Sequence, residues 1–161
     1  MTEDRLPDLA LYQEDPEWLI TEFARRVPDV LHAVAVTSDG VLVAASGEMQ
    51  PGDLEQLSAL TAGMTGLAGT AAEVLDNGAV IQALVTMERG TLVIMAIDDG
   101  SSLAVLTTAA ADLDTVAYEM TMLVEDSGTV FAPPRRRAVR DAAHGTRGQP
   151  AKTPLPQRRR D

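Results

Sequence analysis

The sequence contains no cysteine, and this absence excludes disulfides, thiolate metal ligands and cysteine nucleophiles. Histidine occurs only twice, as His32 at the start of a predicted strand and His144 near the C-terminus. Neither histidine has a catalytic partner nearby in the sequence. We therefore expect no metal site, no cofactor and no catalytic residue.

Lysine occurs only once, at Lys152, outside the part of the chain that is predicted to fold. A lysine nucleophile is therefore excluded for that part. The glycine-rich segment 63–70 also lacks the lysine and the preceding strand that a phosphate loop requires. The acidic pair Asp98-Asp99 is typical of a turn. No enzyme signature remains, so the sequence predicts a non-catalytic protein.

Long apolar runs are missing as well, since none approaches the roughly 18 residues that cross a membrane. The first residues, Met1 to Asp8, are polar and acidic and lack the basic start and apolar core of a secretion signal. From these two observations we expect a cytoplasmic protein.

The charge of the chain is divided between an acidic body and a basic tail. Residues 1–131 hold 22 acidic residues against four arginines, and residues 132–161 hold nine basic residues against two acidic ones. The acidic body repels nucleic acid and anionic membranes, so we expect the folded part to bind neither. Three interpretations of the tail remain open: it contacts an acidic partner or an anionic membrane, it folds over its own acidic body, or it does nothing.

Little of the chain after Phe131 can be buried, because it continues with Ala-Pro-Pro-Arg-Arg-Arg and then with further Gly, Pro and Arg. We therefore predict a flexible acidic N-terminus at residues 1–15, one folded domain at 16–131 and a disordered basic Pro/Arg-rich tail at 132–161. A chain of this length supports one such domain.

The first predicted elements are a helix and a hairpin. Asp15 is a suitable N-cap, and apolar residues at helical spacing then continue to Pro28, which predicts a helix at about 16–27. The turn sequence Ser38-Asp39-Gly40 separates two short apolar runs. This pattern predicts a hairpin with strands at about 31–37 and 41–46.

The remaining elements are two helices and three strands. Leucines at steps of three and four predict a long amphipathic helix at 51–75. A second helical pattern begins at Leu113, is capped by Asp112 or Asp114, and ends near Ser127. Between the helices, three strand-like runs separated by glycine turns predict an antiparallel meander at 79–87, 91–97 and 102–108. The order α-β-β-α-β-β-β-α predicts an α+β fold.

The interior of the long predicted helix contains three glycines, Gly63, Gly66 and Gly69, each of which costs about 1 kcal/mol relative to alanine. On a helix, they join other small residues in a smooth stripe at steps of four, four and three. The stripe is Ser58, Ala62, Gly66 and Gly69, and its neighbours are Ala59, Gly63 and Thr70. Because such a stripe lets another backbone approach closely, we interpret it as an interface with a second copy or another partner, a two-fold dimer being favoured. The alternative is that the glycines pack internally against the sheet.

Several parts of the sequence together carry a resemblance to a known family. They are Trp18-Leu19, Arg25 to Val30, His32 to Ser46, the Ala/Gly-rich long helix and the pattern Leu113-x-x-Val116-Ala117-Tyr118-Glu119-Met120. In order and spacing they resemble the roadblock family of dynein-light-chain and GTPase-regulator domains, in the form found in bacterial operons called conservons. The resemblance covers about residues 16–131 and rests on no single motif.

This resemblance implies a curved five-stranded antiparallel sheet with one long helix on one face and two helices on the other. It also implies a homodimer formed through the long helix and the third strand into a continuous sheet, which adds Ile81, Ala83 and Val85 to the expected interface. Roadblock domains bind small Ras-like GTPases and scaffold signalling assemblies, and a sensor-kinase-like protein is among the conservon neighbours.

The leading hypothesis is therefore a non-catalytic homodimeric regulator or scaffold for a small Ras-like GTPase in a bacterial signalling assembly. One alternative is a GTPase-activating protein, since some bacterial members of the family stimulate GTP hydrolysis. An arginine finger would then have to come from Arg25, Arg26 or Arg89. A second alternative is a small-molecule-sensing α/β domain, which requires an interior cavity.

Overall fold

The chain folds in the predicted order, with each element within a residue of its expected bounds apart from the third strand. The computed structural model describes residues 15–97, 100–128 and 130–131. Within them the elements are α2 (Pro16–Arg26), β1 (Val30–Val36), β2 (Leu42–Ala45), α3 (Pro51–Leu75), β3 (Gln82–Met87), β4 (Gly90–Ala96), β5 (Ser102–Thr108) and α4 (Leu113–Ser127). The Asp98-Asp99 turn, the basic tail and the predicted N-terminal segment before Asp15 lie outside the described residues.

The third strand begins at Gln82, later than the predicted residue 79. Gln82 pairs with Met95, and β4 ends at the next residue, Ala96. Residues 79–81 therefore have almost no neighbouring strand with which to pair, and they belong to the connection from α3.

The ends of helix α2 are set by two flanking residues, Asp15 and Pro28. The Asp15 carboxylate accepts a hydrogen bond from the Glu17 N–H at 3.0 Å, and Pro16 occupies the first turn, where a missing N–H costs little. Pro28 disfavours helical geometry in the residue before it, and Val27 is accordingly extended, with φ −84° and ψ 121°. These two ends limit the helix to 11 residues.

The β1–β2 hairpin turns at the predicted Asp-Gly pair and supports α3. Gly40 has φ +86°, a conformation that glycine adopts with little strain. A Cβ built on Gly40 would lie 3.6 Å from both the Ala59 Cα and the Ala62 Cβ of α3. The hairpin turn therefore lies directly against the long helix.

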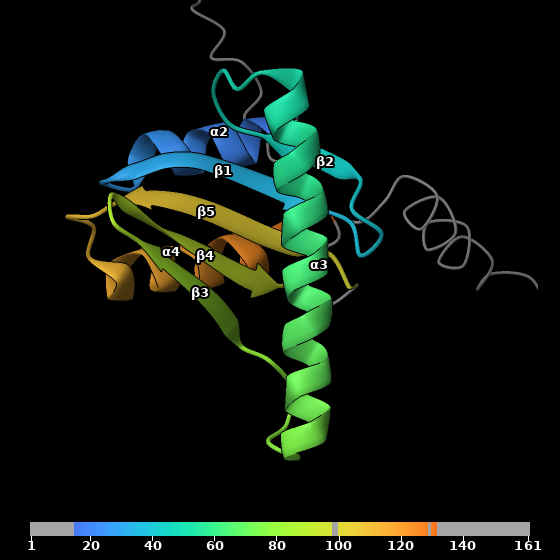
Figure 1. Cartoon of the computed structure of the whole chain (residues 1–161). Coiled ribbons are helices and arrows are strands. Elements are labelled where there is room, and N and C mark those ends of the chain that lie inside the picture. The colour runs from blue at the N-terminus through green and yellow to red at the C-terminus, as the bar shows by residue number, and fades with distance from the viewer. Residues whose placement is uncertain (1–14, 98–99, 129, 132–161) are drawn as a thin grey trace, which may run out of the picture.

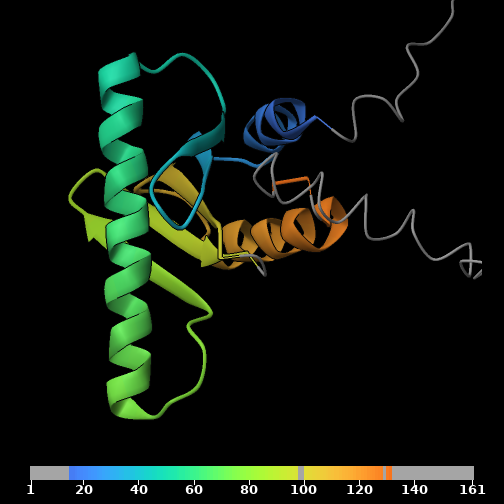
Figure 2. The ribbon, with the colours of Figure 1, turned by 90° about the vertical axis from the view of Figure 1, so that its right-hand side faces the viewer.

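The five strands form one antiparallel sheet in the order β2-β1-β5-β4-β3, and helices cover both of its faces (Figure 1). Turned by 90°, the molecule shows three layers, with α3 alone on one face and α2 and α4 together on the other (Figure 2). This is the α+β arrangement that the sequence predicted. The central strands are mostly apolar because both of their faces are covered.

Alternate residues of the central strands point into two separate cores. The larger core lies under α2 and α4, and its fully buried members include Phe23, Leu103, Val105, Met120 and Phe131. The smaller core lies under α3 and contains Val34, Val36, Leu92, Ile94 and Ala104. Since apolar burial is the main stabilising contribution, α3 is the less firmly held of the two helical layers.

Helix α4 is capped by Asp112, the first of the two candidate residues. The Asp112 carboxylate accepts hydrogen bonds from the backbone N–H groups of Asp114 and Thr115, at 3.1 and 3.4 Å. At the other end, the Val130 N–H donates to the Ser127 carbonyl at 2.9 Å. The described part of the chain then ends at Phe131, which is fully buried.

Replacing Gly90 with alanine is expected to lower the free energy of unfolding by about 1–3 kcal/mol. A Cβ at this position would lie 2.4 Å from the Thr107 carbonyl oxygen of the neighbouring strand. Gly52→Ala is the matched control, because a Cβ on Gly52 meets nothing within 4 Å. Urea unfolding measures both variants, and equal stabilities would contradict the close approach of β4 and β5.

Candidate interaction surface

Helix α3 is longer than the sheet on which it lies. Its 25 residues span about 37 Å at 1.5 Å per residue, whereas five strands spaced about 4.8 Å apart span roughly 20 Å. Figure 1 shows the C-terminal part of α3 projecting past the edge strand β3. In this projecting part, Val74 and Leu75 are 79% and 66% exposed.

The inward side of α3 is partly polar. Ser58 and Thr61 are almost completely buried, and the Thr65 hydroxyl lies 2.9 Å from the Ser102 hydroxyl at the start of β5. The Ser58 hydroxyl donates to the Leu54 carbonyl at 2.7 Å, whereas the buried Thr61 hydroxyl has no hydrogen-bond partner. Burying such groups adds little to the attraction between helix and sheet and costs energy where they are unpaired.

The outward side of α3 is apolar. Leu60, Leu67 and Val74 recur every seven residues along one stripe and are 61%, 74% and 79% exposed. The expected single apolar face is thereby divided, because Leu57 and Met64 pack on the sheet while Leu60 and Leu67 point away from it. A row of large exposed apolar side chains marks a site of interaction with another surface.

The three helical glycines touch nothing else in the described chain. A Cβ built on Gly63, Gly66 or Gly69 would meet no atom within 4 Å, so the internal packing considered as an alternative does not explain them. With Leu60 and Leu67, Gly63 lines a shallow groove of about 510 Å³ on the outer surface of α3. The glycines therefore lower the stability of the helix while leaving a smooth outer face.

The predicted stripe of small residues is divided between two sides of α3. Its exposed members are Ala59, Gly63, Gly66 and Thr70, and its half-buried members are Ala62 and Gly69. Ser58 is 1% exposed against its own domain and has no surface left to offer a second copy. We correct the expectation at Ser58: together with Ala62, it lies where the Gly40 turn meets the helix.

Strand β3 is an edge strand that pairs only with β4 among the described strands. Its residues Gln82–Met87 include no proline and no charged side chain, the features that commonly prevent an edge from pairing with another strand. Ala83 and Val85 are half-buried under α3, and Ile81 just before the strand is 80% exposed. A hollow of about 510 Å³ separates the projecting end of α3 from the connection to this strand.

The three candidate arginines have different environments. Arg25 is ion-paired with Glu22 in its own helix, and the hydrogen bonds that it donates hold the pKa of Glu22 below its usual value. Arg26 is ion-paired with Glu119 of α4 at 3.0 Å and so connects the two helices of that layer. Arg89 lies in the exposed β3–β4 turn and has no ion-pair partner within the described residues.

No group of three or more histidine, cysteine, aspartate or glutamate residues in the described ranges is placed to hold a metal ion. The helices in these ranges also include none that is both long and apolar enough to cross a membrane.

Residues 16–107 match the family model of the Roadblock/LC7 domain. Because the match spans more than half of the chain, the protein belongs to the Roadblock/LC7 family. The match covers α2, α3 and nearly all of the sheet and ends before α4.

Solved structures of the same domain are similar to this chain. A Roadblock/LC7 domain from Streptomyces avermitilis is 29% identical, with a TM-score of 0.65, and the alignment covers 81% of this chain and 98% of that one. Another from the same organism is 36% identical, with a TM-score of 0.56 and coverage of 68% and 94%. MglB of Myxococcus xanthus shares the fold at 16% identity, with a TM-score of 0.65 and coverage of 71% and 93%. No curated protein matches the chain.

Leu67→Asp is expected to weaken self-association about tenfold or more, because it places a carboxylate in an apolar contact worth about 1.5–3 kcal/mol. Sedimentation equilibrium over a range of concentrations measures the change. Gly66→Leu, which fills the smooth face of α3, is expected to act in the same direction.

Tyr118→Asp is the control, because Tyr118 is 63% exposed on α4, on the opposite side of the sheet. Equal solution masses for Leu67→Asp, Tyr118→Asp and the unchanged chain would contradict an interface on α3.

Proposed function

We propose that this protein is a non-catalytic homodimeric regulator or scaffold that binds a small Ras-like GTPase in a bacterial signalling assembly in the cytoplasm. The observation that carries the proposal is the exposed apolar side of α3 next to the unpaired edge of β3. Membership of the Roadblock/LC7 family supports a GTPase-related regulatory role, because resemblance to roadblock domains implies GTPase binding.

The proposed dimer follows from two surfaces that lie side by side. Antiparallel pairing of β3 with its copy joins two sheets and satisfies backbone groups that the edge leaves free. The end of α3 that projects past one sheet then lies over the sheet of the other subunit. In this arrangement Leu67 and Val74 become buried and Gly63 and Gly66 allow the two long helices to approach closely.

A regulatory role without catalysis fits the side chains of the domain. Arg25 is ion-paired with Glu22, and Arg26 is ion-paired with Glu119. We therefore propose that the dimer acts by binding and positioning the GTPase, whose own residues carry out GTP hydrolysis.

The test of GTPase binding is capture from native bacterial lysate with the purified full chain as bait. One sample contains excess GDP and the other contains a non-hydrolysable GTP analogue. We expect mass spectrometry to identify a small Ras-like GTPase that is retained preferentially in one nucleotide state. Leu67→Asp bait tests whether capture requires the dimer, with Tyr118→Asp bait as the control.

If the bait retains no GTPase in either nucleotide state, the proposed function is contradicted. The dimer is tested separately, by its mass in solution. The small-molecule sensor would then be the better hypothesis. A thermal-shift screen that raises the melting temperature with a metabolite would support it.

A GTPase-activating role is the second candidate, favoured by Arg89, which is exposed and has no ion-pair partner among the described residues. If Arg89 enters the site of a partner GTPase, Arg89→Ala is expected to reduce stimulated GTP turnover about 10³-fold or more, with little change in dimer mass. Single-turnover hydrolysis by the captured GTPase measures the effect. Arg25→Ala is the control, and equal turnover in both variants would exclude an arginine finger from this turn.

A further inference from the structure

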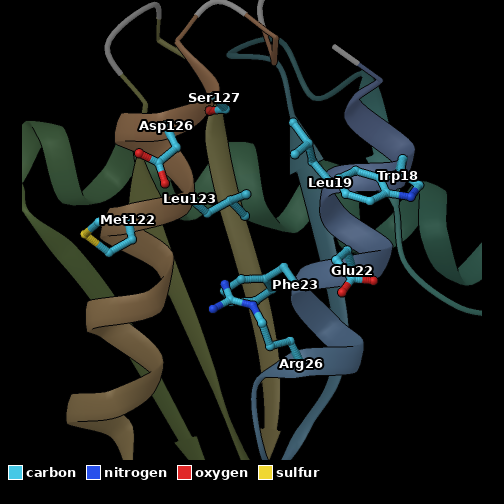
Figure 3. A pocket seen from close by; sticks show the side chains of 9 residues that line it. All are labelled: Trp18, Leu19, Glu22, Phe23, Arg26, Met122, Leu123, Asp126 and Ser127. Atoms are coloured by element: carbon cyan, nitrogen blue, oxygen red, sulfur yellow. The ribbon is translucent and has the colours of Figure 1, made fainter. Parts of the chain in front are cut away.

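A second groove lies on the face of the sheet opposite α3, between α2 and α4. It has a volume of about 390 Å³, and its lining includes Trp18, Glu22 and Arg26 of α2 and Met122, Asp126 and Ser127 of α4 (Figure 3). The proposed dimer and GTPase functions do not use this groove, so it requires a separate explanation.

The groove has one carboxylate, that of Asp126, at the end where α4 finishes, and Glu125 precedes it on the helix without lining the groove. Helix α4 carries four acidic residues and no basic one, and two of them, Glu125 and Asp126, are in its last turn. Carboxylates at a helix C-terminus add to the negative end of the helix dipole, which is an unfavourable arrangement. A cation bound here would relieve both the repulsion between carboxylates and the effect of the dipole.

The domain does not supply that cation from its described residues. Arg25 is ion-paired with Glu22, and Arg26 is ion-paired with Glu119, almost two turns earlier on α4. Glu125 and Asp126 therefore have no ion-pair partner in the described ranges. A basic ligand would complete the charge balance of the groove.

The chain itself continues from this position with a basic sequence. Ser127 lines the groove, Phe131 is buried four residues later, and Arg135-Arg136-Arg137 begins four residues after Phe131. Four residues reach at most about 14 Å, so the arginine cluster is held within reach of the α4 terminus. Such a short connection gives a high effective concentration, of the order of millimolar, which a separate partner would have to exceed.

We propose that the groove between α2 and α4 is the docking site of the chain's own basic C-terminal segment, residues 132–161, with Arg135 to Arg137 next to Glu125 and Asp126. The docked segment covers the α2–α4 face of its own subunit. An acidic partner or an anionic membrane gains access to the tail only by displacing it from this groove. Because the contact is between charged groups at the surface, high salt releases it.

Limited trypsin digestion of the full chain tests the proposal by measuring the initial rate of cleavage after Arg135 to Arg137. We expect Asp126→Lys to increase this rate about three- to tenfold at low salt, as loss of a few surface ion pairs predicts. Glu48→Lys is the matched control, with the same change of charge at an exposed residue of the connection between β2 and α3, and its rate should equal that of the unchanged chain.

Trp18 provides a second measurement, because it is the only tryptophan of the chain and lines the groove. We expect its fluorescence emission to shift when salt is raised from about 0.02 M to about 0.5 M. Replacing Arg135, Arg136 and Arg137 together with serine should produce the same shift at low salt and abolish the response to salt.

Three results would overturn the proposal. One is cleavage of the unchanged chain at low salt as fast as that of a synthetic peptide of residues 132–161. Another is an equal increase for Asp126→Lys and Glu48→Lys, which would indicate an effect of overall charge. The third is protection of the tail from trypsin that disappears when the protein is diluted. This result would assign the contact to the tail of a second copy.

Discussion

A helix of 25 residues cannot be covered by a sheet of five strands, and the organisation of this domain depends on that mismatch. The side of α3 that does meet the sheet contains the buried hydroxyls of Ser58 and Thr61, while Leu60, Leu67 and Val74 are directed outward. The length of α3 and the outward direction of its leucines therefore have the same effect on its exposed apolar area. Both leave a large apolar surface on α3 that the described residues of the chain do not bury.

The two faces of the sheet have different physical characters as a result. The α2–α4 face closes a continuous core around Phe23, Met120 and Phe131, and the Arg26–Glu119 ion pair connects its two helices across the surface. Stability is concentrated there, so the α3 face can carry glycines and exposed leucines without loss of the fold. The α2–α4 face instead carries carboxylates, so the contact proposed there depends on salt, whereas the contact proposed for α3 depends on apolar area.

The fold was accessible from the sequence because its signals are local. Asp15, Pro28 and the Asp39-Gly40 turn act through the backbone of their immediate neighbours, and the family resemblance supplied the order of the layers. The start of β3 was predicted too early because pairing, not composition, ends a strand. The face of α3 that meets the sheet was not accessible, because leucines occur on both sides of this helix. The threonines and serine that face inward were the available signal, but spacing alone does not show that they are buried.

The exposed apolar side of α3 affects how much of the protein a cell retains. Exposed leucine stripes are the kind of surface that chaperones and proteases bind, and the contact-free glycines make this helix easier to open locally. A copy that finds no partner presents both features at once. If α3 forms the proposed interface, quality control can distinguish surplus copies from assembled ones, and the helix that allows assembly also limits the lifetime of an unassembled chain.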